Sequence, residues 1–470
     1  MQAKKEGEKK TFFKGAAWIA TGGFLSKLIG ALYRIPLTNL IGGYGMGLYQ
    51  LAYPLYTLLL TISATGIPSA IAKLTAERVG AGTPLRPLFN TALRLFAWIG
   101  LGGTLLMAGL AIPLSYAQGA PEAAGGYWAL APSVLLVSAL SVYRGYMQGK
   151  KDMFPTAVSE VVEQIVKVAV GLPIAYYLKA TPARAVVGLL FAVSVAEGAA
   201  LLFVWLYAQK KHPRLSLKGE ERVRGRSVLK TSLPVTVSAA LLPLSHLVDS
   251  VLIVRLLQRH TESAVNLYGL MTGGALTLIN LPVSVCYGLA AASVPAVASA
   301  QNNKERRKNV RFSLLSTLAL SLPCAVGLFL LAGLAQRLVY PSLSVADGEI
   351  LVRLVRMLAV STVTLSCLQT AAACLTALGK PSRAAFSMGV AMSLKAVLQL
   401  CLVGNPRFSI YGAALATNFG YLVAFLLDLY YNIKVTKEDV SAGGVLPIRR
   451  SKNDRCRWFG CKKRGLDRGG

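Results

Sequence analysis

The sequence predicts an all-α integral membrane protein with about twelve transmembrane helices in two six-helix lobes. Hydrophobic residues make up 54% of the chain and charged residues only 15%, with a mean hydropathy of +0.53. Soluble domains carry about 25% charged residues, so this composition indicates a chain that exposes apolar surface to lipid. The same figures exclude a disordered chain and a disulfide-rich scaffold.

Apolar segments recur along the chain and are separated by short polar stretches. Each is longer than the ~20 residues that a helix needs to cross the hydrocarbon core, so each predicts one transmembrane helix. The predicted helices cover residues 13–38, 44–76, 88–117, 126–149, 153–178, 184–208, 227–257, 265–299, 310–339, 350–378, 382–403 and 409–433.

The charge of the chain is strongly positive, with 50 lysines and arginines against 20 acids. In a soluble protein this excess would suggest nucleic-acid binding. Here most basic residues fall in the terminal segments and in alternate loops. The positive-inside rule therefore predicts a plasma-membrane protein with both termini cytoplasmic and no nucleic-acid partner. The basic C-terminal tail is expected to contact anionic membrane lipids. The loops predicted to lie outside hold few basic residues: Lys179, Arg184, Arg255, Arg259, Arg337, Arg353 and Arg407.

The two halves of the sequence resemble each other. MQGKKDMFPTAVSEVVEQIVK (147–167) and ALGKPSRAAFSMGVAMSLK (377–395) both place Gly-Lys in a loop before a helix with a deep lysine, Lys167 or Lys395. Because each half starts on the cytoplasmic side, the repeat is parallel, an arrangement typical of transporters whose halves rock around a central site.

This repeat predicts four regions. They are an N-terminal lobe (1–209), a basic cytoplasmic linker (210–226), a C-terminal lobe (227–433) and a basic, disordered cytoplasmic tail (434–470).

Basic residues in the first predicted helix suggest a binding site. An ionisable residue at mid-membrane costs about 2.5–3.5 kcal/mol on insertion scales. Gly23, Lys27, Gly30 and Arg34 share one helical face, and this segment contains no acid. We therefore expect Lys27 and Arg34 to bind an anionic substrate in a cavity. The alternative is that Arg34 extends outward to the membrane interface.

Two further buried lysines, Lys167 and Lys395, are added to the predicted substrate-binding residues. Glu163 precedes Lys167 by four residues, the favourable order for an ion pair on one helix. This pair either neutralises charge structurally or takes part in gating or substrate binding.

Gating or coupling is expected of Glu163, Arg144, His246 and Asp249. Arg144 lies near a cytoplasmic helix end, where anchoring of a loop is the alternative role. His246 and Asp249 share one face of the seventh predicted helix. Asp249 would either hold a coupling cation or proton, or pair with a lysine of the cavity.

An enzymatic function is not expected. The sequence contains no P-loop, no H-E-x-x-H and no G-x-S-x-G motif, and its histidines are three. We predict no catalytic residues, no metal site and no cofactor.

Two stretches resemble a known family. FLSKLIGALYRIPLTNLIGGYGMGLYQLAYPLYTLLLTISATGIPSAIAKL (24–74) and YRGYMQGKKDMFPTAVSEVVEQIVKV (143–168) are similar to stage V sporulation protein B-like polysaccharide biosynthesis flippases. These belong to the multidrug/oligosaccharidyl-lipid/polysaccharide exporter superfamily. The resemblance implies a V-shaped bundle that works by alternating access.

The resemblance also implies a function in polysaccharide, cell-wall or spore synthesis. The chain is expected to move a lipid-linked, diphosphate-bearing oligosaccharide or peptidoglycan-type precursor across the cytoplasmic membrane, with a coupling cation as a further candidate partner. Two alternatives remain open. One is a drug or cation antiporter of the same superfamily, which would need buried acids. The other is a non-transporting membrane scaffold for cell-wall assembly.

Overall fold

The computed structural model describes residues 2–64, 66–211, 225–300 and 302–441, which form helices joined by short loops. Within these residues, 11 segments are long and apolar enough to cross a membrane. Many large apolar side chains point outward from them, as surfaces in contact with lipid require. Trp98, Phe312 and Leu338, for example, are each at least 70% exposed. The predicted all-α membrane fold is confirmed.

The N-terminal lobe contains the first six long helical segments. They are α1 (Gln2–Ala64), α2 (Gly66–Gly80), α3 (Arg86–Ala117), α4 (Ala124–Gly149), α5 (Phe154–Leu178) and α6 (Pro182–Lys211), with a short 3-10 turn, η1 (Pro121–Ala123). The C-terminal lobe follows. It consists of α7 (Gly225–Leu257), α8 (Ala264–Gly269), η3 (Leu270–Ala275), α9 (Leu276–Ala298), α10 (Asn303–Leu330), α11 (Ala332–Val339), α12 (Val345–Ala377), α13 (Pro381–Leu402) and α14 (Ser409–Ser441).

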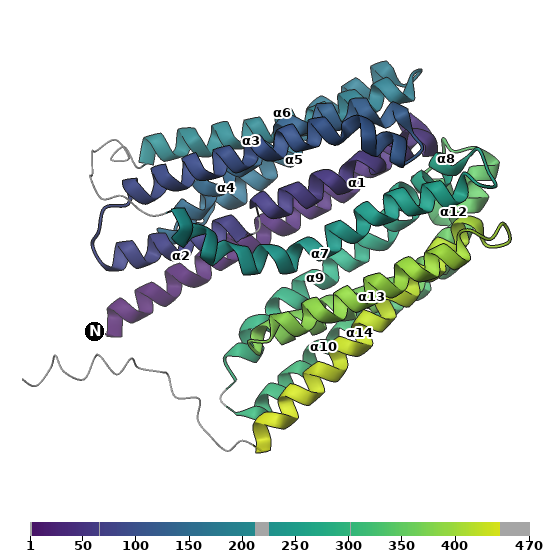
Figure 1. The fold of residues 1–470 in the computed structure, drawn as a ribbon. Coiled ribbons are helices and arrows are strands. Elements are labelled where there is room, and N and C mark those ends of the chain that lie inside the picture. The colour runs from purple at the N-terminus through teal and green to yellow at the C-terminus, as the bar shows by residue number, and fades with distance from the viewer. Residues whose placement is uncertain (1, 65, 212–224, 301, 442–470) are drawn as a thin grey trace, which may run out of the picture.

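The first two predicted helices form one nearly continuous apolar stretch of 60 residues, Thr21–Gly80. At 1.5 Å per residue it would span about 90 Å, enough for two crossings of the membrane. The break lies at Gly42, whose φ of 67° and ψ of −176° are not helical. Only glycine adopts this backbone conformation at little cost. As a result, α2 lies at the same end of the molecule as the N-terminus (Figure 1).

Two predicted boundaries differ from the structure. The predicted helix 310–339 is two helices, because Leu331 (φ −95°, ψ 12°) ends α10 and begins α11. The predicted tail starts too early, since α14 continues to Ser441. Most of the predicted linker (212–224) and of the predicted tail (442–470) lies outside the described residues.

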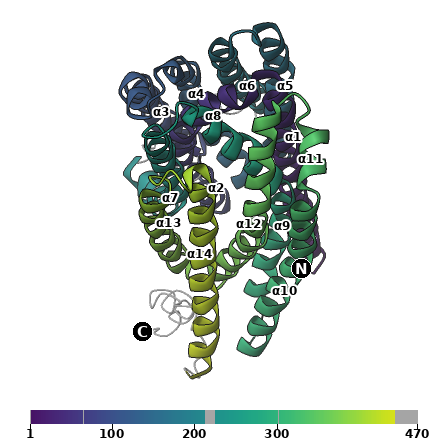
Figure 2. The ribbon, with the colours of Figure 1, turned by 90° about the vertical axis from the view of Figure 1, so that its right-hand side faces the viewer.

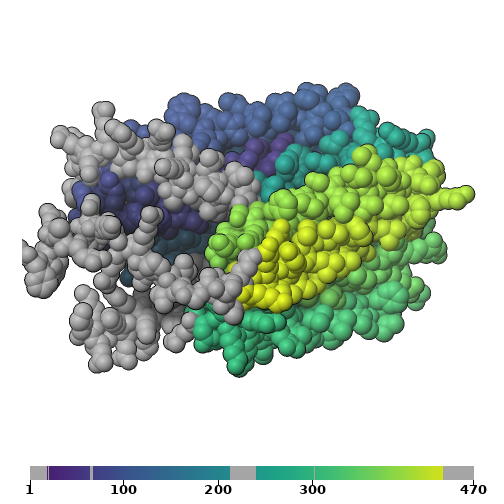
Figure 3. All heavy atoms as spheres, turned by 60° about the horizontal axis from the view of Figure 1, so that its bottom comes forward, coloured from purple at the N-terminus to yellow at the C-terminus, as the bar shows by residue number. Residues whose placement is uncertain are grey.

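The two lobes converge at one end and diverge toward the other (Figures 1 and 2). Figure 3 shows the blue and purple N-terminal lobe in contact with the green and yellow C-terminal lobe at the converging end. We call this end, where α1 meets α8, the closed end. The N-terminus, α2 and the far end of α14 lie at the opposite, open end.

Glycines allow the lobes to approach at the closed end. A Cβ added to Gly47 would lie 2.1 Å from the carbonyl oxygen of Val265, and one added to Gly269 would lie 2.0 Å from the carbonyl oxygen of Gly43. Such distances are far below van der Waals contact, so α1 and α8 pack backbone to backbone here. A side chain at any of these three glycines would force the helices apart.

Hydrogen bonds reinforce this contact. Asn39 Nδ2 donates to the carbonyl oxygen of Val339 at 2.7 Å, and Gln118 Nε2 donates to Ser250 Oγ at 2.9 Å. Both bonds join the N-terminal lobe to the C-terminal lobe. Polar side chains buried in a membrane protein need hydrogen-bond partners. These two bonds therefore stabilise the contact between the lobes at the closed end.

A π-helical segment, η3, follows α8 at the closed end. A Cβ on its Gly273 would lie 2.6 Å from Met46 Cε of α1. π-Helical turns are rare and occur frequently at functional sites. This segment therefore places an irregular backbone at the point where the lobes meet.

Candidate functional site

Lys27 lies on α1 toward the open end, and its side chain is exposed rather than packed in the lobe. Its ammonium lies 3.1 Å from the centroid of the Tyr287 ring on α9. Tyr287 is itself 46% exposed. Because α1 and α9 belong to different lobes, Lys27 faces the space between them. Tyr287 was not predicted, although a tyrosine in an apolar helix was a visible signal in the sequence.

Arg34 lies seven residues further along α1, about 10 Å closer to the closed end along the helix axis. It is half-buried, with its guanidinium carbon 5.8 Å from the centroid of the Tyr53 ring. Among the ion pairs of the described residues, no carboxylate pairs with Arg34. Its guanidinium contacts an aromatic ring and, within the described residues, no acid, so it retains the capacity to bind an anion.

Glycines near Lys27 let α5 approach α1. A Cβ on Gly22 would lie 2.7 Å from Ala157, and one on Gly30 would lie 3.1 Å from Gln164 Oε1. The same contact brings an acid near Lys27, because Glu160 Oε2 would lie only 3.6 Å from a Cβ on Gly23. The first segment contains no acid, but α5 supplies one.

Arg144 and Glu163 form an ion pair that the sequence did not indicate. Arg144 Nη2 lies 3.7 Å from Glu163 Oε2, and Arg144 Nε donates to Ser159 Oγ at 2.9 Å. The expected ion pair between Glu163 and Lys167 is wrong. The ammonium of Lys167 instead donates to Gln164 Oε1, and that amide donates to Glu163 Oε1 at 3.1 Å.

Glu197 on α6 was missed by the sequence analysis. It is only 2% exposed and accepts a hydrogen bond of 3.0 Å from the Tyr56 hydroxyl. Its second carboxylate oxygen has no hydrogen-bond partner. The signal in the sequence was a single acid in the sixth predicted helix. Together with the Arg144–Glu163 pair, Glu197 makes the interior of the N-terminal lobe polar.

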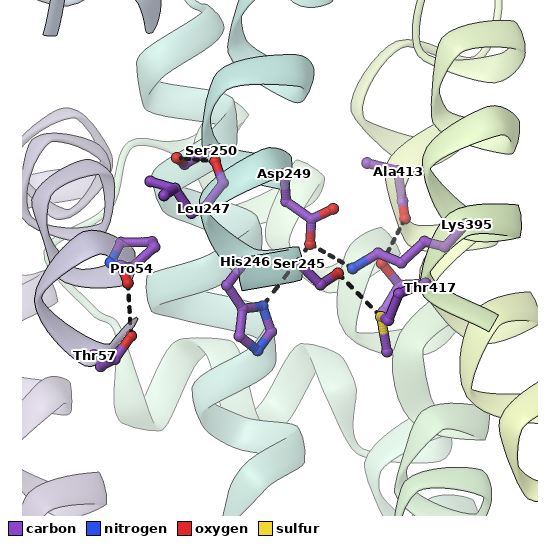
Figure 4. Close-up of polar contacts among 11 residues, drawn as sticks. Pro54, Thr57, Ser245, His246, Leu247, Asp249, Ser250, Lys395, Ala413 and Thr417 are labelled. Carbon is purple, nitrogen blue, oxygen red and sulfur yellow. Dashed lines mark hydrogen bonds and ion pairs between the residues drawn. The ribbon is translucent and has the colours of Figure 1, made fainter. Parts of the chain in front are cut away.

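The C-terminal lobe contains a buried ion pair between α7 and α13 (Figure 4). The ammonium of Lys395 bonds Asp249 Oδ2, and the two residues are 3% and 7% exposed. His246 Nδ1 lies 3.8 Å from the same oxygen, with a side chain that is 43% exposed. Of the two roles considered for Asp249, the structure has the pairing with a lysine.

Lys167 and Lys395, matched by the sequence repeat, lie at comparable places. Each is in the fifth long helix of its lobe, and they are 7% and 3% exposed. Each bonds a side chain of its own lobe, Gln164 and Asp249 respectively. Neither ammonium faces the space between the lobes as Lys27 does, so a role in substrate binding remains a prediction for both.

The fold defines a class of protein. The structure superimposes with a TM-score of 0.77 on the inward-facing conformation of a multidrug resistance MATE family transporter of the MOP superfamily, covering 89% of this chain and 96% of that one at 17% identity. At this identity the likeness shows that the two proteins share one fold, a multi-pass helical membrane bundle.

The sequence specifies the family more closely. The chain belongs to the polysaccharide biosynthesis protein family, whose model matches residues 12–301. It is 28% identical to stage V sporulation protein B of Bacillus subtilis (strain 168), over 89% of this chain and 83% of that protein. It is 23% identical to lipid II flippase MurJ of the same organism, over 88% and 81%.

Proposed function

We propose that the protein moves a lipid-linked, diphosphate-bearing saccharide across the plasma membrane by alternating access. The observation that carries this proposal is the pair of cations on α1. Lys27 is exposed toward α9, and Arg34 has no carboxylate partner among the described residues. An anionic headgroup between the lobes would compensate both charges.

The spacing of the two cations favours a route for the headgroup. Lys27 lies toward the open end and Arg34 toward the closed end, so a diphosphate would meet Lys27 first and Arg34 deeper in the cavity. The lipid chain would remain in the bilayer at the seam between the lobes. Opening of the closed end, where Gly43, Gly47 and Gly269 meet, would then release the headgroup on the other side.

The proposed orientation places the termini and the open end in the cytoplasm. The basic N-terminus and tail support it through the positive-inside rule. A membrane potential that is negative inside then favours outward movement of an anion by about 2.3 kcal/mol per charge per 100 mV. A coupling cation remains part of the proposal, but Asp249 is a weaker candidate for binding it because Lys395 occupies its carboxylate.

The relatives support a lipid-linked substrate over the drug or cation antiporter. One of them is named a lipid II flippase, and the family is described by polysaccharide biosynthesis. An antiporter for cationic drugs would need free acids facing the cavity. In this chain the side chains that face it from α1 are cationic.

Reconstituted vesicles test this proposal. Purified protein is inserted into vesicles with fluorescent lipid-diphosphate saccharides, and headgroup translocation is followed with and without a membrane potential. We expect the Lys27→Ala/Arg34→Ala variant to lose at least tenfold in rate. Lys179→Ala, which removes an exposed lysine beyond the end of α5, serves as the matched control. Full translocation by the stably inserted double variant would contradict the site, whereas no translocation by the unaltered protein would leave the scaffold alternative.

A further inference from the structure

Asp428 of α14 is a buried acid that is 1% exposed. Neither of its carboxylate oxygens accepts a hydrogen bond from the part of the chain that the structure describes. No ion pair of the described residues includes it. An isolated carboxylate in a low-dielectric interior is very costly, so such a group normally carries a proton or binds a cation.

The polar side chains next to Asp428 donate their hydrogens to backbone carbonyl oxygens. Asn432, one turn further along α14, is also 1% exposed and uses its amide hydrogens on the carbonyl oxygens of Ala371 and Asp428, each at 2.9 Å. Its Oδ1 atom has no partner. Ser387 of α13, which lies beside the carboxyl group, donates its hydroxyl hydrogen to the carbonyl oxygen of Arg383 at 3.0 Å. With the Ser387 hydrogen directed to that carbonyl oxygen, the carboxylate oxygens of Asp428 accept no hydrogen bond from the described residues.

The helices packed against Asp428 bring few charges to it. On α12, no charged residue follows Arg356, and on α10 none follows Arg311. On α13, the guanidinium of Arg383 lies 5.5 Å from the ring of Tyr431, which extends from α14. Lys395 of α13 forms an ion pair with Asp249 of α7, and His246 of α7 lies beside the same carboxylate. Lys434 is the next charged residue on α14 itself.

We propose that Asp428 is a proton-binding site of the C-terminal lobe, carrying a proton in the conformation described here. A proton on the carboxyl group converts one acceptor into a donor. The neutral acid can then donate to Asn432 Oδ1 or to Ser387 Oγ, which are otherwise left with unused lone pairs. A divalent metal fits poorly, because the described residues contain no group of three or more histidines, cysteines or acids.

This site would give the transporter a coupling proton separate from the Asp249–Lys395 pair. Proton release at Asp428 would leave a buried negative charge. That charge would favour any conformation in which water reaches the space between α13 and α14. This second step rests on the proposed function, whereas proton binding itself does not.

Infrared spectroscopy of the purified full-length protein tests proton binding directly. The protein is produced with an isotopic label on the aspartate side-chain carboxyl, which separates aspartate signals from those of glutamates such as Glu197. At neutral pH we expect a carbonyl-stretch band of a protonated aspartic acid. It should be lost in Asp428→Asn, which is isosteric, and retained in Glu349→Gln, which removes an exposed acid of α12.

Each other outcome overturns the site. An absent band at neutral pH shows that Asp428 is ionised, and a band of unchanged intensity in Asp428→Asn belongs to another aspartic acid. A band that appears only when sodium is removed assigns the site to an alkali cation instead. The thermal unfolding midpoint of Asp428→Asn verifies that the variant is folded. In Asp428→Glu the labelled band should be lost and an unlabelled band of a protonated glutamic acid should appear if the site accepts a longer acid.

A transport measurement then tests coupling. Translocation is measured in vesicles at several pH values, and Asp428→Asn is expected to flatten the pH dependence of the wild-type rate. A protonated Asp428 in a protein that moves no lipid-linked saccharide would refute the proposed function but not the proton site. Translocation with unchanged pH dependence in Asp428→Asn would refute coupling through this residue.

Discussion

Lys27 of α1 and Tyr287 of α9 face each other across the two lobes, with the ammonium 3.1 Å from the centroid of the ring. Cation–π contacts at partly exposed sites contribute about 0.5–1 kcal/mol. This contact joins the lobes on the side toward the open end, while the glycine contacts join them at the closed end. It also holds the cation that we propose meets the substrate first, so substrate binding and lobe separation would compete for one side chain.

Removing the Tyr287 ring should shift the equilibrium between conformations. Loss of about 0.5–1 kcal/mol corresponds to a change of roughly two- to fivefold in the population of this conformation. We expect Tyr287→Leu to show this change in distances between spin labels on the two lobes. Tyr287→Phe keeps the ring and should behave as the wild type. An equal effect of both substitutions would show that the hydroxyl, and not the ring, matters.

A side chain at Gly47 should open the closed end. Its Cβ would lie 2.1 Å from a backbone oxygen of α8, which cannot move as a flexible side chain can. We expect Gly47→Ala to increase labelling of nearby introduced cysteines by a reagent applied from the closed side. Gly102→Ala is the control, because nothing lies within 4 Å of its added Cβ. Equal labelling of both variants would contradict close packing at this contact.

Breaking the Asp249–Lys395 pair on one side should cost more than removing both charges. Loss of one partner of a buried ion pair typically costs about 3–5 kcal/mol, because the remaining charge is uncompensated. We expect Lys395→Met to lower the thermal unfolding midpoint strongly, and Asp249→Asn/Lys395→Met to recover most of the loss. Additive losses in the double variant would mean that the two side chains do not interact.

Glu163 should couple to Arg144 and not to Lys167. Double-mutant cycles isolate such pairwise terms, provided that each single change creates no new contact. Free energies of unfolding are measured for Glu163→Gln combined with Arg144→Gln or with Lys167→Met. We expect a coupling energy of at least about 0.5 kcal/mol with Arg144. A larger coupling with Lys167 would support the ion pair expected from the spacing along α5.

The elements that depend on local sequence were predictable. Hydropathy located the membrane-spanning helices, because lipid forces the backbone into helices wherever an apolar stretch is long enough. The division at Leu331 and the length of α14 were missed. The division lies inside a continuous apolar run, where hydropathy shows no change, and the last turns of α14 are polar, where hydropathy predicts no membrane helix.

The partners of buried charges were less predictable. Spacing along α5 suggested that Glu163 pairs with Lys167, but Arg144 from α4 competes for the same acid. Glu197 and Asp428 were visible as single acids in apolar helices, yet the sequence could not distinguish an acid with a donor from an acid without one. Such distinctions depend on helices that are far apart in the chain.

The sequence by itself determined three features of this protein. Its apolar composition indicates a membrane protein, the positions of Lys27 and Arg34 define a cationic first helix, and the similarity of its two halves indicates two lobes. Only the tertiary structure decided which charges remain available. Packing brings α5 against the glycines of α1, ties Lys395 to Asp249 and leaves Arg34 and Asp428 without charged partners. The physical reason is that the energy of a charge in a low-dielectric interior is set by its nearest neighbours in space, which the linear order of residues does not contain.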